Sequence, residues 1–261
     1  MDFARVTLAI DNGVALLTLN DPDVMNAAGE PMLDDILAAL DIVEDESSGA
    51  RCLVLTGAGT AFCSGANLKE RGHGKAKPVG IVLETHWHPL LRRLRRLHCP
   101  IVTAVNGAAA GGGMAFALTG DIVIAARSAY FLQAFRRIGL APDVGSTWFL
   151  PRRIGVARAM ELSLLGEKLP AEKALAWGLI NRVVDDGAAL DEAMKVAREL
   201  AAGPTKALAL IRGLYWDSTE NAFEEQIDLE YRMQRIAGAS ADFKEGVTAF
   251  LEKRPAKFTG A

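Results

Sequence analysis

The sequence predicts an α/β core followed by a helical C-terminal region, and three observations support this fold class. Short aliphatic stretches alternate with segments of helical spacing in the first part of the 261-residue chain. Two of these stretches run into loops of small residues, and nearly all of the chain after Asp143 has helical spacing. Strands that alternate with helices form sheets covered by helices. We therefore expect an α/β core over residues 1–190 and a helical subdomain over 191–261.

Composition excludes several other classes of protein. The formal net charge of −3 gives no general attraction to nucleic acid or to an anionic membrane. The N-terminus lacks the basic-then-apolar order of a signal peptide, and no apolar run is long enough to span a membrane. The three cysteines are too few and too scattered for a disulfide framework. We therefore expect a cytoplasmic protein that does not bind membranes and has no general attraction to nucleic acid.

The first predicted element is a β-hairpin. Residues 5–20 alternate apolar and polar side chains around Asn12-Gly13, a pair that favours a tight turn. A helix follows, because apolar side chains recur at helical spacing up to the acidic stretch 44–48. These side chains are Leu33, Ile36, Leu37, Leu40 and Val43. A strand over 51–56 comes next.

That strand leads into a first loop of small residues, GAGTAFCSGANLK, from Gly57 to Lys69. Cys63 lies in this loop, and without a histidine motif beside it we expect packing rather than nucleophilic catalysis. Residues 71–80 then combine glycine, lysine and proline without periodicity, which predicts a mobile loop.

The next predicted helix has leucines on one face and arginines on the other. The leucines are Leu90, Leu91, Leu94 and Leu97, and the arginines are Arg92, Arg93, Arg95 and Arg96. A charged helix face is usually solvated, and binding of a phosphate or RNA is the alternative. Just before this helix, His86 and His88 have no acidic or cysteine partner at ligand spacing, so we expect no metal site.

A second loop of small residues, VNGAAAGGGM from Val105 to Met114, lies between the strand 100–105 and an apolar helix beginning near 115. Its glycines either allow a tight crossover or bring backbone N–H groups close to a ligand. Dinucleotide and P-loop sites are poorly supported, because GxGxxG and GK[ST] are absent. Two such loops, each aiming one N–H group at a single oxygen, would form an oxyanion hole.

The rest of the chain is predicted to be mostly helical. A strand over 121–126 completes a further strand and helix unit. Gly166 and Pro170 mark the boundaries of two short helices, and residues 177–184 are predicted to form a short extended segment. Three longer helices are expected between 190 and 250.

Together the two loops resemble those of the crotonase, or enoyl-CoA hydratase/isomerase, superfamily, and the resemblance covers nearly the whole chain. It implies a spiral core of repeated ββα units, a homotrimer or homohexamer, and an acyl-CoA thioester as substrate without a further cofactor. It also implies that the N–H groups of Ala66 and Gly112 stabilise the oxygen of a thioester enolate. By resemblance, CoA contacts the residues Val24, Ala66, Asn67, Leu68, Lys69 and Gly112, together with Phe250 and Lys253 from an adjacent subunit.

Hydratases of this superfamily use two glutamates, and the corresponding positions here are Ala115 and Phe135. Neither side chain transfers a proton, so the standard hydratase mechanism is not expected. Asp143 follows shortly afterwards, at a position that holds a catalytic aspartate in isomerase and dehalogenase branches. Its alternative role is the N-cap of the next helix. Glu70 and Glu84 remain candidates for a second acid.

The resemblance therefore implies an acyl-CoA isomerase in which Asp143 shuttles a proton. Its expected reactions are the isomerisation of 2-(1,2-epoxy-1,2-dihydrophenyl)acetyl-CoA or the conversion of a 3-enoyl-CoA to a 2-enoyl-CoA. An enoyl-CoA hydratase is one alternative, and a non-catalytic relative that binds acyl-CoA or RNA is another. The acyl group, the pathway and the choice between trimer and hexamer stay open.

Overall fold

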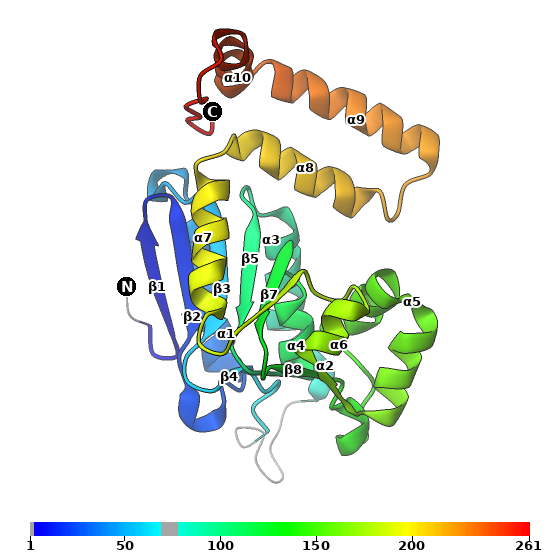
Figure 1. Ribbon diagram of the computed structural model, residues 1–261. Helices are drawn as coiled ribbons and strands as arrows, with labels where there is room; N and C mark the ends of the chain where they lie inside the picture. The colour runs from blue at the N-terminus through cyan, green and yellow to red at the C-terminus, as the bar shows by residue number, and fades with distance from the viewer. Residues whose placement is uncertain (1–2, 69–77) are drawn as a thin grey trace.

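The computed structural model describes residues 3–68 and 78–261, which form two β-sheets surrounded by helices (Figure 1). The larger sheet has six strands in the order β1-β2-β3-β5-β7-β10. Only β1 and β2 are antiparallel; every later neighbouring pair is parallel. The strands are β1 Val6–Asp11, β2 Val14–Leu19, β3 Cys52–Gly57, β5 Ile101–Val105, β7 Ile122–Ala126 and β10 Arg182–Val184.

The N-terminal hairpin is confirmed. Asp11 pairs with Val14, so Asn12 and Gly13 form a two-residue turn with φ angles of 49° and 80°. Two positive φ angles define the type I′ turn, which matches the twist of a hairpin and favours Asn-Gly.

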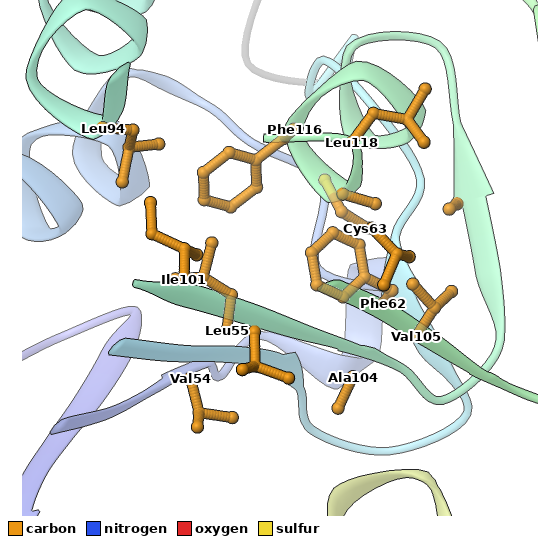
Figure 2. Close-up of a cluster of buried hydrophobic side chains, with 14 of the residues drawn as sticks. Val54, Leu55, Phe62, Cys63, Leu94, Ile101, Ala104, Val105, Phe116 and Leu118 are labelled. Atoms are coloured by element: carbon orange, nitrogen blue, oxygen red, sulfur yellow. The ribbon is translucent and has the colours of Figure 1, made fainter. Parts of the chain in front are cut away.

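Helices cover both faces of the larger sheet. In Figure 2 the side chains of Val54 and Ala104 lie on one side of the central strands, and Leu55, Phe116 and Leu94 lie on the other. The first side is covered by α7 (Ala189–Ala201), which packs against β3 and β5. Leu94 belongs to α3 (His88–Arg96) and Phe116 to α4 (Gly112–Ala117). Since β3 and β5 are completely buried, their runs of apolar residues suit this central place.

A second, four-stranded sheet is a feature that the sequence reasoning missed. Its order is β4-β6-β8-β9, with strands β4 Ala61–Cys63, β6 Ala108–Ala110, β8 Tyr130–Leu132 and β9 Lys168–Pro170. Each strand has three residues, and β6 consists of alanine, which has a low strand propensity. With these strands, the chain runs through three similar units. The first is β3, β4 and a helical segment, the second is β5, β6 and α4, and the third is β7, β8 and α5 (Ser146–Leu165). This order confirms the expected ββα repeats.

Six further short or helical elements precede α5. They are η1 (Pro22–Val24), α1 (Glu30–Glu44), η2 (Glu46–Ser48), α2 (Val79–Val82), the π-helical η3 (Leu83–Trp87) and η4 (Phe135–Ile138). Residues 71–77 of the predicted mobile loop lie outside the described residues, and Gly80 belongs to α2.

The C-terminal part corrects one expectation. The segment before Gly166, α5 (Ser146–Leu165), consists of two helical parts joined at Gly155, whose φ of 79° and ψ of 158° are not helical. After α6 (Ala171–Ala176) and α7 come α8 (Thr205–Asp217), α9 (Phe223–Gly238) and α10 (Ala241–Glu252), so four helices replace the expected three. The last break arises at Ser240, whose Oγ accepts a 3.0 Å hydrogen bond from the Phe243 N–H and caps α10.

The helices α8 and α9 pack together beyond the end of the sheet, with α10 next to them (Figure 1). Arg212 of α8 is 6% exposed and joins α8 to the core. Its Nε donates to Asp121 Oδ2 at 2.5 Å, and its terminal nitrogens donate to the carbonyl oxygens of Leu97 and Leu94 at 2.7 and 3.1 Å. Burial raises the pKa of Asp121, while the neighbouring Arg212 acts in the opposite direction.

Candidate active site

The two predicted loops lie against each other because they contain β4 and β6, which are parallel neighbours. A Cβ atom at Gly107 would lie 2.0 Å from the Thr60 carbonyl oxygen, and one at Gly113 would lie 2.3 Å from the Cys63 carbonyl oxygen. No side chain fits in either place. Gly107 and Gly113 are therefore required by the close approach of the first loop.

Hydrogen bonds to Ala28 orient the predicted donor Ala66. The Ala28 N–H donates to the Gly65 carbonyl at 2.7 Å, and the Asn67 N–H donates to the Ala28 carbonyl at 3.3 Å. Extended residues point their backbone groups to alternate sides, so the Ala66 N–H faces away from Ala28. Gly65 has a φ of +98°, which turns the chain at this point.

The other predicted donor, Gly112, is the first residue of α4. The N–H groups of the first helical residues have no acceptor within their own helix. Gly111 directs the chain into α4 with a φ of +53°, and its N–H donates to the Leu132 carbonyl at 2.8 Å. A Cβ at Gly65 would lie 3.7 Å from Gly112 N. Both predicted donors thus belong to one small region of the structure.

Asp143 lies on the loop between η4 and α5 and is half-buried. Its carbonyl oxygen accepts a 2.9 Å hydrogen bond from the Ser146 N–H. Gly145, and not Asp143, occupies the N-cap position of α5. Val144 connects this loop to the glycine loop, because its Cγ2 lies 3.2 Å from the position of a Cβ on Gly112.

Apolar side chains surround the rest of the Gly111-Gly112 turn. Phe135 is 6% exposed, and its Cζ lies 3.9 Å from the position of a Cβ on Gly111. Trp87 is 3% exposed, and its Cζ2 lies 3.7 Å from the corresponding position on Gly112. Ala115 is completely buried. Ala115 and Phe135, the positions at which the resemblance would place the two glutamates of hydratases, are therefore packed apolar residues.

The predicted CoA residues fall into two groups. Val24 and Met25 lie beside the first loop, because their carbonyl oxygens accept hydrogen bonds from Ser64 Oγ at 3.2 Å and from the Ser64 N–H at 3.0 Å. Next to Ala66, Asn67 is buried and Leu68 is 51% exposed.

Within one chain, Phe250 and Lys253 do not join this group. Figure 1 shows α10 at the opposite end of the fold from β4 and β8. Phe250 is 81% exposed, and Lys253 is the C-cap residue of α10. Lys69 and Glu70 lie outside the described residues, whereas Glu84 is exposed on η3.

Asn26 is a site-building residue that the sequence reasoning missed. It is completely buried, and its Nδ2 donates to the carbonyl oxygens of Ala58 and Ala61 at 2.9 and 2.8 Å. Its Oδ1 accepts from the Asp21 N–H at 2.9 Å. One side chain therefore joins the η1 segment to the first loop. Only the Asn-Ala pair at the end of that segment hinted at such a role.

The structure gives little support to Cys63 as a nucleophile or to the arginines of α3 as a phosphate or RNA site. Burial raises the pKa of the Cys63 thiol to about 11, which keeps the thiol protonated near neutral pH and fits the packing role. Within the described residues, two of the arginines of α3 form ion pairs: Arg93 with Asp41 and Glu44, and Arg95 with Asp217 and Glu220.

The described residues contain neither a metal-ligand cluster nor a membrane-spanning helix. In residues 3–68 and 78–261, no three His, Cys, Asp or Glu side chains gather as metal ligands. No helix in the same part of the chain is long and apolar enough to cross a membrane.

Comparison with known proteins finds similarity over almost the whole chain. The sequence profile of the family described as enoyl-CoA hydratase/isomerase matches residues 9–261. The chain is 48% identical to the 1,2-epoxyphenylacetyl-CoA isomerase of Escherichia coli K12, over 96% of this chain and 97% of the relative. It is 45% identical to a probable enoyl-CoA hydratase of Rhodobacter capsulatus, over the full length of both chains.

A solved structure gives the same result for the fold. The crystal structure of an enoyl-CoA hydratase subunit from Geobacillus kaustophilus superposes with a TM-score of 0.92 and 33% sequence identity. The superposition covers 100% of both chains.

Proposed function

The chain belongs to the enoyl-CoA hydratase/isomerase family, and on that premise we propose that it isomerises an acyl-CoA thioester through an enolate. The N–H groups of Ala66 and Gly112 hold the thioester oxygen, and Asp143 carries the proton. The proposed substrates are 2-(1,2-epoxy-1,2-dihydrophenyl)acetyl-CoA and 3-enoyl-CoA esters. The first of these corresponds to the substrate named for the relative from Escherichia coli.

The shift of a double bond needs one proton carrier and one oxyanion hole. The Asp143 carboxylate removes a proton from C2 of a 3-enoyl-CoA, and the electron pair moves onto the thioester oxygen. Two N–H donors aimed at that oxygen stabilise the charge as it develops. The protonated carboxyl group then returns the proton to C4, which leaves the double bond between C2 and C3. No atom is gained or lost.

The observation that carries this proposal is the combination of one carboxylate with an otherwise apolar turn. Asp143 precedes Val144, which contacts the Gly112 turn, whereas Ala115 and Phe135 occupy the glutamate positions of hydratases. Addition of water needs a group that activates the water and a group that protonates carbon. Proton transfer between two carbons of one substrate needs a single group.

The first experiment identifies the products. The purified protein is incubated separately with a 3-enoyl-CoA, a 2-enoyl-CoA and the epoxide, and each product is analysed by chromatography and mass. Isomers of unchanged mass that are missing with Asp143→Asn support the proposal. Gain of one water by the 2-enoyl-CoA, unaffected by Asp143→Asn, contradicts it. Glu84→Gln is compared in parallel, because loss of activity there identifies Glu84 as a second acid.

Hydratase activity is the second candidate, and the similarity to the probable hydratase of Rhodobacter capsulatus favours it. This candidate requires an acid that compensates for Ala115 and Phe135. The mass measurement separates the two reactions directly.

We further propose that residues 191–261 mediate assembly into a trimer or hexamer and complete the CoA channel of a neighbouring subunit. One face of α10 carries Phe243, Val247, Phe250 and Leu251, which are 54%, 43%, 81% and 73% exposed. Their spacing places them on one apolar stripe. Sedimentation of Phe250→Asp tests this proposal, since the variant is expected to dissociate and to bind CoA esters more weakly. Three free cysteines fit a reducing compartment, and we propose the cytoplasm.

A further inference from the structure

Val144 has an unusual backbone conformation for its residue type. Five described residues other than glycine have a positive φ, and Val144, at +52°, is the only β-branched one among them. Left-handed backbone conformations are unfavourable for β-branched side chains and persist only when the surroundings enforce them. Val144 is 3% exposed, so its side chain is packed on almost all sides.

The turn itself does not require a valine. Asp143 and Ser146 close it with a 2.9 Å hydrogen bond, and Val144 and Gly145 have φ angles of +52° and +79°. The turn of the N-terminal hairpin has φ angles of +49° and +80°, and the residue in its first position is Asn12. Asparagine tolerates this conformation far better than valine does. A feature outside the turn must therefore explain why a valine occupies this position.

The contact between the Val144 side chain and Gly112 explains the valine. Val144 Cγ2 lies 3.2 Å and Val144 Cβ 3.9 Å from the position of a Cβ on Gly112, and Trp87 Cζ2 lies 3.7 Å from the same position. Gly112 is therefore bounded by two apolar side chains. The left-handed φ is what directs the Val144 side chain to this glycine while Asp143 stays one residue away.

We propose that Val144 is a positioning residue that fixes the separation between the Asp143 carboxylate and the N–H group of Gly112. This inference rests on the proposed function, in which these two groups act on one substrate. Proton transfer is sensitive to small displacements, and a shift of about 1 Å can reduce a rate about 100-fold. A branched side chain pressed against Gly112 restricts that displacement.

The test uses two substitutions that preserve the turn and remove the contact, Val144→Asn and Val144→Gly. Both are expected to fold, because their backbones accept a positive φ, and to lower kcat about 10- to 100-fold with little change in KM. Val144→Thr keeps the β-branched shape and is expected to retain most of the kcat. Asn12→Gly, in the equivalent turn of the hairpin, is the matched control and is expected to leave kcat unchanged.

Several results would overturn the inference. They are full kcat in Val144→Asn, loss of kcat only in proportion to a lowered melting temperature, and an equal loss in Asn12→Gly. Combination with Asp143→Asn separates this inference from the proposed function. If Val144 acts through Asp143, then Val144→Asn has no further effect on kcat in the Asp143→Asn background. Full activity of Asp143→Asn alone would instead refute the proposed function.

Discussion

Replacement of Gly113 by alanine tests whether the two loops must touch. A Cβ at Gly113 would lie 2.3 Å from the carbonyl oxygen of Cys63 and 2.8 Å from its carbonyl carbon, whereas ordinary contacts begin at 3.4 Å. Both atoms belong to the backbone of β4, so no side chain can move aside. The loops must separate by the difference between 3.4 and 2.3 Å, which is 1.1 Å.

This displacement sets the expected magnitudes. Overpacking of a filled core costs about 1–3 kcal/mol, which for a chain of this size lowers the melting temperature by about 2–12 °C. A shift of about 1 Å between the predicted donors is expected to reduce kcat about 100-fold. Gly213→Ala is the matched control, because nothing lies within 4 Å of an added Cβ in α8. Alanine is expected to stabilise that helix by about 0.5–1 kcal/mol.

The assay combines thermal unfolding, followed by circular dichroism, with isomerisation of a 3-enoyl-CoA. Gly113→Ala should melt earlier and react more slowly, and Gly213→Ala should melt slightly later with unchanged kcat. If Gly113→Ala has the stability and kcat of the unchanged protein, the close approach of the loops is not required.

Three further predictions concern residues whose polar side chains join separate parts of the fold. Asn26→Ala removes three hydrogen bonds and should lower the free energy of unfolding by about 2–4 kcal/mol, measured by urea denaturation. Arg212→Leu leaves the carboxylate of Asp121, whose side chain is 22% exposed, without its ion pair, and the same measurement should give a loss of about 1–3 kcal/mol. Hydrogen bonds from Arg254 lower the pKa of Glu245 to about 2, so the stabilisation of the C-terminal tail is complete above pH 4.5. That stabilisation is lost as the pH falls from 4.5 towards 2, so proteolysis of the tail should accelerate in this range, and Glu245→Gln should abolish this pH dependence.

Sequence reasoning succeeded where a local pattern determines the structure. Asn12-Gly13 specifies the hairpin because both residues accept a positive φ. The leucines of α3 face the core, where Leu90 and Leu94 are at most 1% exposed. The expected pair of neighbouring loops also appeared, since each loop follows a strand of the same sheet.

Prediction from the sequence failed where contacts between residues far apart in the chain determine the structure. The strand Ala108–Ala110 exists because its neighbours β4 and β8 supply hydrogen bonds, not because alanine favours strands. The left-handed conformation of Val144 depends on contact with Gly112, which lies more than thirty residues earlier in the chain. Nothing in the local sequence around Ala108–Ala110 or around Val144 indicates these backbone conformations.

The most direct test of the proposed mechanism is the kcat of Asp143→Asn for conversion of a 3-enoyl-CoA to a 2-enoyl-CoA, with its melting temperature measured alongside. Asparagine preserves the size of the side chain and cannot accept the proton. We predict a loss of about 100-fold or more in kcat, which is the usual contribution of a general base, with an unchanged melting temperature. A variant that retains the full kcat would contradict the assignment of Asp143 as the proton carrier.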